Sequence, residues 1–81
     1  MSTISQSDVM AAIEKALDLS PGSLKESSRA EEISSWDSLG QLSVLAALDK
    51  IFIGKIAQIS EMAEADSVPK ILQILRQHSL L

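Results

Sequence analysis

The sequence predicts an all-α fold, a bundle of three main helices with a short fourth helical segment. Apolar residues recur at helical spacing in three separate stretches. Strand signals are nearly absent, because no alternating run is bounded by hairpin turns. The chain has 81 residues, of which 46% are hydrophobic, so we expect one domain, residues 1–81, with one small core.

The first helix should begin at Ser5-Gln6-Ser7-Asp8, because this tetrapeptide has the form of a capping box. Ser20-Pro21-Gly22 should end it, since proline cannot continue a helix and glycine favours a turn. Apolar residues at helical spacing lie between these signals: Val9, Ile13, Ala16 and Leu17.

Residues 20–36 form a long and mostly polar connection, and a loop of this length often carries function. We expect Leu24 and Ile33 to attach it to the bundle, because a free loop loses entropy without any compensating burial. Trp36, at the end of the connection, is expected to be a further anchor.

The second helix should begin at Asp37 and Ser38, either of which can cap the free N–H groups of its first turn. We expect this helix to end at Gly54. A helix this apolar lies centrally in a bundle or presents an apolar edge to partners. Its apolar stripe consists of Leu39, Leu42, Leu45, Leu48 and Phe52, widened by Val44 and Ile51.

Two further segments complete the expected bundle. Residues 59–65 should form one or two helical turns. The last helix should be capped by Ser67, with Pro69 in the first turn, where its missing N–H matters little. Its buried stripe is predicted as Val68, Ile71, Leu72 and Leu75.

Composition argues against several classes of function. There is no cysteine and only one histidine, His78, with no acid nearby in the sequence, so an enzyme is the class least expected. The net charge of −4 argues against a nucleic-acid partner. Neither a membrane-spanning run nor a signal peptide is recognisable, so we expect a cytoplasmic monomer without a membrane partner.

Ser38 is the residue best placed for chemistry. The start of a helix presents unpaired N–H groups and a partial positive charge. A phosphate linked to Ser38 would therefore lie where anions are stabilised. The alternative is that Ser38 only caps the helix, a common use of serine at this position.

Residues 37–52, Asp-Ser-Leu-Gly-Gln-Leu-Ser-Val-Leu-Ala-Ala-Leu-Asp-Lys-Ile-Phe, closely resemble the attachment helix of the acyl carrier protein family. Chain length and helix order also match, so the resemblance covers nearly the whole chain. It implies an acyl-carrier-like four-helix bundle. It also implies that a phosphopantetheinyl transferase, using coenzyme A and magnesium, attaches a phosphopantetheine arm to the oxygen of Ser38. No metal site is expected, because the chain has no cysteine and only one histidine.

The arm's thiol would carry acyl groups as thioesters, which explains how a chain without cysteine takes part in thiol chemistry. The implied partners are acyl-loading, acyl-transferring and acyl-modifying enzymes of fatty acid or specialised (polyketide, surface polysaccharide) biosynthesis. The resemblance also implies six recognition residues: Asp37 and Leu39 beside the serine, Leu42 and Ala46 along the helix, and Glu61 and Glu64 in the acidic short segment.

The sequence departs from the family pattern at a few positions. Ser43 and Lys50 stand where fatty acid carriers often have glutamate, and Trp36 stands where they have a small residue. Ser35-Trp36 replaces the glycine pair of peptidyl carriers. These features favour a freestanding carrier of a specialised pathway. Two alternatives stay open, namely a peptidyl or aminoacyl carrier and an unmodified helical interaction module.

Overall fold

The structure is a computed structural model that describes residues 4–81, so residues 1–3 of the expected domain lie outside the described part. It contains three α-helices, α1 (Gln6–Ala16), α2 (Ser38–Ile51) and α3 (Val68–Gln77). Three 3-10 segments join them, η1 (Ala30–Glu32), η2 (Ile56–Gln58) and η3 (Ser60–Glu64). Strand-like pairing in residues 4–81 is limited to one isolated bridge, and the all-α prediction is confirmed.

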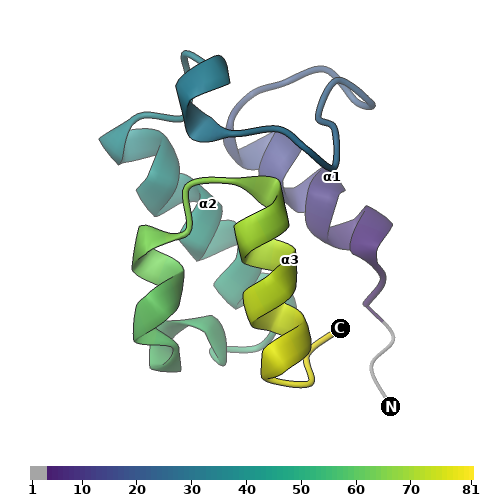
Figure 1. Ribbon diagram of the computed structural model, residues 1–81, viewed down its shortest axis with the longest axis vertical. Coiled ribbons are helices and arrows are strands. Elements are labelled where there is room, and N and C mark those ends of the chain that lie inside the picture. Colours follow the sequence, from purple (N-terminus) through teal and green to yellow (C-terminus); the bar gives the residue numbers. More distant parts are fainter. Residues whose placement is uncertain (1–3) are drawn as a thin grey trace.

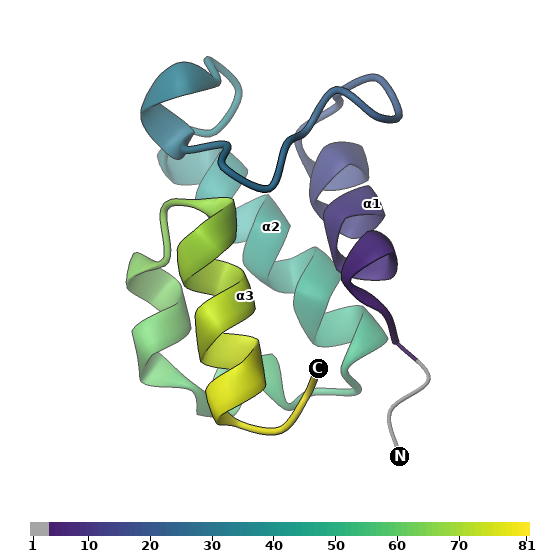
Figure 2. The same ribbon diagram turned by 45° about the vertical axis from the view of Figure 1, so that its right-hand side comes forward.

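Helix α2 occupies the middle of the bundle (Figures 1 and 2). It packs against α1 on one side and against η2 and η3 on the other, while α3 closes the bundle next to η3. None of the helices in residues 4–81 has the length and apolar character needed to cross a bilayer.

The predicted helix starts are confirmed by their caps. Ser5 and Asp8 form the complete capping box of α1, with the Ser5 hydroxyl accepting from the Asp8 N–H at 3.2 Å. Ser67 caps α3 by accepting from the N–H of Lys70, also at 3.2 Å. These local hydrogen bonds depend only on residues three apart, which explains why sequence patterns find them.

The predicted end of the first helix is wrong, because α1 ends at Ala16, before Ser20-Pro21-Gly22 is reached. Asp18 takes a left-handed conformation (φ +57°), and the N–H of Leu19 donates to the carbonyl of Glu14 at 2.8 Å. This is a Schellman motif, which satisfies the last carbonyls and turns the chain away from the helix axis. Proline is therefore not what stops α1.

Only part of the apolar stripe of α2 is buried, and the rest forms an exposed apolar edge. Leu39 and Leu42 are 75% and 63% exposed. The residues of the helix that are buried are Gly40, Val44 and Leu48, followed by Phe52 just after it, with Leu45 and Ile51 partly buried. A stripe with a spacing of four residues faces α1 and the η segments, which turns Leu39 and Leu42 toward solvent.

The long connection is attached to the bundle as predicted, since Leu24 and Trp36 are buried and Ile33 packs against the core. Three features were not predicted. The short η1 turn interrupts the connection. It is joined to the segment just before α3, where the Ala30 N–H donates to the Asp66 carbonyl at 2.8 Å. The buried carboxylate of Glu14 accepts from the N–H of Leu24 at 2.9 Å.

Candidate functional site: the N-terminal end of helix α2

Asp37 caps α2, with its Oδ1 accepting from the N–H of Gly40 at 2.9 Å. Ser38 is the first residue of the helix and is exposed. Its hydroxyl forms no hydrogen bond with any residue in 4–81. The sequence left open which of the two residues caps, and the structure assigns that role to Asp37. Ser38 therefore presents a free hydroxyl group at the start of a helix.

The backbone around this hydroxyl favours negative charge. Asp37 already accepts from two N–H groups of the first turn, those of Gly40 and Gln41. The N–H groups of Ser38 and Leu39 have no partner among residues 4–81. Two unpaired donors and the positive end of the helix dipole thus lie beside the Ser38 oxygen. An oxyanion attached there would meet both.

Gly40 lets the first turn of α2 lie directly against the preceding loop. A Cβ atom at this position would collide with the Ser35 carbonyl oxygen and press on the Leu17 side chain. Only glycine allows such a close approach of two backbone segments. The start of α2, and with it Ser38, is therefore held in place by the loop and by the end of α1.

Gln41 holds the same turn from the other side. Its Oε1 accepts from the Trp36 Nε1–H at 2.6 Å. Its Nε2 lies 3.3, 3.2 and 3.0 Å from the carbonyl oxygens of Met62, Ala63 and Ala65. This side chain joins the loop, α2 and the end of η3. The sequence signal was a lone amide in an apolar helix, but its partners in η3 are more than twenty residues away.

Three of the expected residues share one face of α2. Ser38, Leu42 and Ala46 are spaced four residues apart, so they follow one another along the helix surface. Leu39 lies beside them in the first turn, and all four are exposed. Ala46 also borders a groove of about 330 Å³ between α2 and the η2–η3 region. Its lining is Leu45, Ala46, Asp49, Ile56, Ala57, Ile59, Ser60, Met62 and Ala63.

The two expected glutamates are exposed, but the structure does not gather both at Ser38. Glu61 lies 3.6 Å from Nε2 of His78, at the end of α3. That end is opposite the start of α2 in the bundle (Figure 1). Glu64 is at the other end of η3, where the chain meets Gln41. The fold thus gives His78 an acid that the local sequence lacks, in a solvent-exposed pair.

Comparisons of the chain with models of known families, with curated proteins and with solved structures found no match.

Proposed function

We propose that this chain is an acyl carrier protein that carries a phosphopantetheine arm on Ser38. The observation that supports the proposal best is the exposed Ser38 hydroxyl, which has no protein partner although it opens a helix. Asp37 performs the capping that would otherwise explain a serine there. The order of helix, long loop, central helix, short segment and last helix supports the finer assignment to an acyl-carrier-like bundle.

The residues at this position fit the phosphate of such an arm. A phosphodiester keeps one negative charge, and the free N–H groups of Ser38 and Leu39 would face it at the positive end of α2. When attached, the group supplies a thiol that holds acyl cargo as a thioester. The protein itself contributes position and recognition, because Gly40 and Gln41 fix the turn that bears Ser38.

The surface next to Ser38 suits enzymes that bind briefly and then release. Leu39 and Leu42 expose two large apolar side chains within about one turn of the attachment point. Because they are three residues apart on one helix, these two leucines form a small apolar patch that offers a partner an apolar contact. The groove beside Ala46 continues this surface toward η3. We therefore place partner recognition at Asp37, Leu39, Leu42 and Ala46, with Glu64 nearer to them than Glu61.

The test is modification in vitro followed by intact mass measurement. The purified chain is incubated with coenzyme A, magnesium and a phosphopantetheinyl transferase of broad specificity. We expect a gain of one phosphopantetheine on the wild type and none on Ser38→Ala. Ser43→Ala is the matched control, because Ser43 is an exposed serine of the same helix, and it should be modified like the wild type.

The proposal would be overturned if the wild type gained no mass, even with transferases of the source organism, while circular dichroism showed that it is folded. The exposed pair Leu39 and Leu42 would then favour the alternative, an unmodified helical interaction module. If the arm is attached, loading assays with acyl and aminoacyl donors distinguish an acyl carrier from an aminoacyl or peptidyl carrier.

A further inference from the structure

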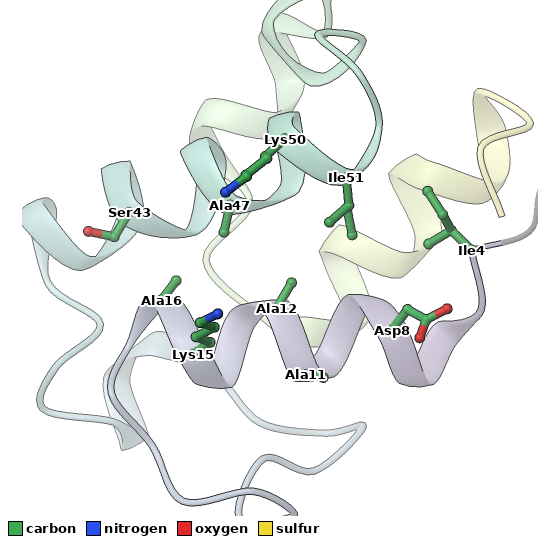
Figure 3. A pocket seen from close by; sticks show the side chains of 10 residues that line it. All are labelled: Ile4, Asp8, Ala11, Ala12, Lys15, Ala16, Ser43, Ala47, Lys50 and Ile51. Carbon is green, nitrogen blue, oxygen red and sulfur yellow. The ribbon is translucent and has the colours of Figure 1, made fainter.

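A second and larger groove runs between α1 and α2, with a volume of about 640 Å³ (Figure 3). The two helices are antiparallel here, with Ala16 opposite Ser43, Ala12 opposite Ala47, and Ile51 near Ile4 (Figure 3). Volumes of this size are typical of small-molecule sites. The groove does not include Ser38 or any of the expected recognition residues.

The middle of the groove is apolar because four of its lining residues are alanines. Ala12 and Ala47 point toward each other across it (Figure 3). Their methyl groups leave unfilled the space that larger side chains occupy between most packed helices. Asp8 and Ala16, like Ser43 and Ile51, are eight residues apart, which corresponds to about 12 Å of helix. The apolar floor is therefore long and narrow, like an extended alkyl chain.

The charges around the groove are unusual for this chain. The protein carries a net charge of −4, yet Lys15 and Lys50 both line the groove. Neither ammonium group pairs with a carboxylate in residues 4–81. The Lys50 side chain extends back along α2 toward Ala47, on the part of the groove that Lys15 and Ala16 flank (Figure 3). Two unpaired cations from two helices thus adjoin one apolar channel.

The single acid of the groove lies elsewhere. Asp8 is at the far end, beside Ile4 (Figure 3). Its carboxylate is engaged in the α1 cap, where Oδ2 accepts from the Ser5 N–H at 2.9 Å. The groove is therefore cationic toward Ala16 and Ala47 and has no free acid there to neutralise the lysines.

We propose that this groove binds a single-chain anionic amphiphile of the fatty acid class. The alkyl chain lies along the alanines between α1 and α2. The carboxylate lies between Lys15 of α1 and Lys50 of α2, and Ser43 lines the groove on the α2 side. The proposal does not depend on the modification of Ser38, because the groove is formed by the unmodified chain.

The test is a titration of labelled Ser38→Ala protein with decanoate, below its micelle concentration, followed by NMR. Decanol and decyltrimethylammonium have the same chain length with neutral and cationic head groups. We expect saturable shifts at Ala12, Ala16 and Ala47 with decanoate, weaker binding of decanol, and no saturable binding of the cation. Joint replacement Lys15→Gln and Lys50→Gln should weaken decanoate binding about fivefold and leave decanol unchanged. Lys55→Gln, outside the groove, is the charge control.

A steric pair completes the design. Ala47→Leu should fill the groove and abolish binding, whereas Ala46→Leu, which faces the other groove, should not. Circular dichroism checks the fold, and the two exposed lysines provide a test that does not alter packing. Any of three results would overturn the proposal. Decanoate could shift the NMR signals of Ala46 and Ala63 instead, the cationic amphiphile could bind as tightly as decanoate, or the lysine variants could bind decanoate like the parent protein. Because every protein in this test carries Ser38→Ala, these results are independent of whether the chain is a carrier.

Discussion

The carboxamide of Gln41 is the point where three segments of the chain meet. It accepts from Trp36 and donates toward three carbonyls around the end of η3. Trp36 is buried, and its N–H needs an acceptor that no apolar residue could supply. A single side chain thus satisfies a buried indole and fixes the segment that borders the proposed partner surface.

We predict that Gln41→Ala lowers the free energy of unfolding by about 2 kcal/mol, because it leaves the buried indole N–H of Trp36 and the part-buried carbonyls of Met62 and Ala65 without this partner. Urea unfolding, monitored by the fluorescence of Trp36, measures the loss. Gln73→Ala, the same change on the exposed side of α3, is the control and should shift stability by less than about 0.5 kcal/mol. Equal losses in the two variants would contradict the role given to Gln41.

Ile53 has a backbone conformation that β-branched residues rarely adopt. It follows α2 in a left-handed conformation (φ +55°) and is 87% exposed. The motif it completes, with the Gly54 N–H donating to the Asp49 carbonyl at 2.8 Å, usually has glycine or asparagine at this position. Gly54 follows one residue later, also with positive φ. The sequence therefore marks the end of α2 closely but not the strained residue.

We predict that Ile53→Asn raises the free energy of unfolding by about 1 kcal/mol, since asparagine tolerates the left-handed region that a β-branched residue avoids. For a domain of this size the melting temperature should rise by about 4–8 °C. Ile53→Val keeps the β-branch and should melt like the wild type. A melting temperature of Ile53→Asn at or below that of Ile53→Val would show that no strain is relieved.

At the scale of the element, helix propensity and tertiary packing favour different residues in the first turn of α2. Glycine is a weak helix former, and by propensity alone alanine at position 40 would stabilise α2 by about 1 kcal/mol. The carbonyl of Ser35 occupies the space that a methyl group would need. The turn that bears Ser38 is thus positioned by its neighbours and not by its own helical preference.

We predict that Gly40→Ala destabilises the protein by about 1–3 kcal/mol, the usual range for an added group in a filled space. Chemical denaturation measures the change, and its sign alone decides between packing and propensity. Ser43→Ala, in the exposed middle of the same helix, should change stability by no more than about 0.5 kcal/mol. A stabilised Gly40→Ala would mean that the Ser35 loop moves away at little cost.

Element prediction succeeded where the signal is local. Ser5, Ser67 and Pro69 mark helix starts through contacts within four residues, and η3 appeared within the predicted residues 59–65. The buried face of α2 could not be predicted, because apolar residues occur on every side of that helix. Which apolar residues are buried depends on where α1 and η3 lie, and this turned Leu39 and Leu42 outward.

At the scale of the whole molecule, charge is the property that a distant partner meets first. The acids are concentrated in residues 31–66, and the chain carries a net charge of −4. Opposite charge on a partner raises the rate of encounter without requiring a tight complex. Fast and weak association suits a carrier, which must release each partner after transfer.

We predict that kcat/KM for modification of this chain by a transferase with a basic docking face falls several-fold between about 0.1 M and about 1 M salt. Over that range the screening length decreases from about 10 Å to about 3 Å. Glu61→Gln combined with Glu64→Gln should lower the rate at low salt and reduce its salt dependence. The control is a transferase whose own stability does not change over this range of salt. With such an enzyme, a modification rate that is independent of salt would exclude electrostatic steering.

The expectation that Ser38 carries the chemistry rests on the resemblance of residues 37–52 to an attachment helix, and it stays a prediction. The sequence by itself determined the helical class and the starts of α1, α2 and α3. These features depend on the spacing of residues and on contacts within one helical turn, so the sequence alone predicts them. The structure assigns the cap of α2 to Asp37, a local contact that the sequence left open between two residues able to make it. Only the tertiary structure decided that Gln41 joins the loop to η3 and that two lysines share an alanine-lined groove. Both of these tertiary features join segments that are far apart in the chain and that packing alone brings together.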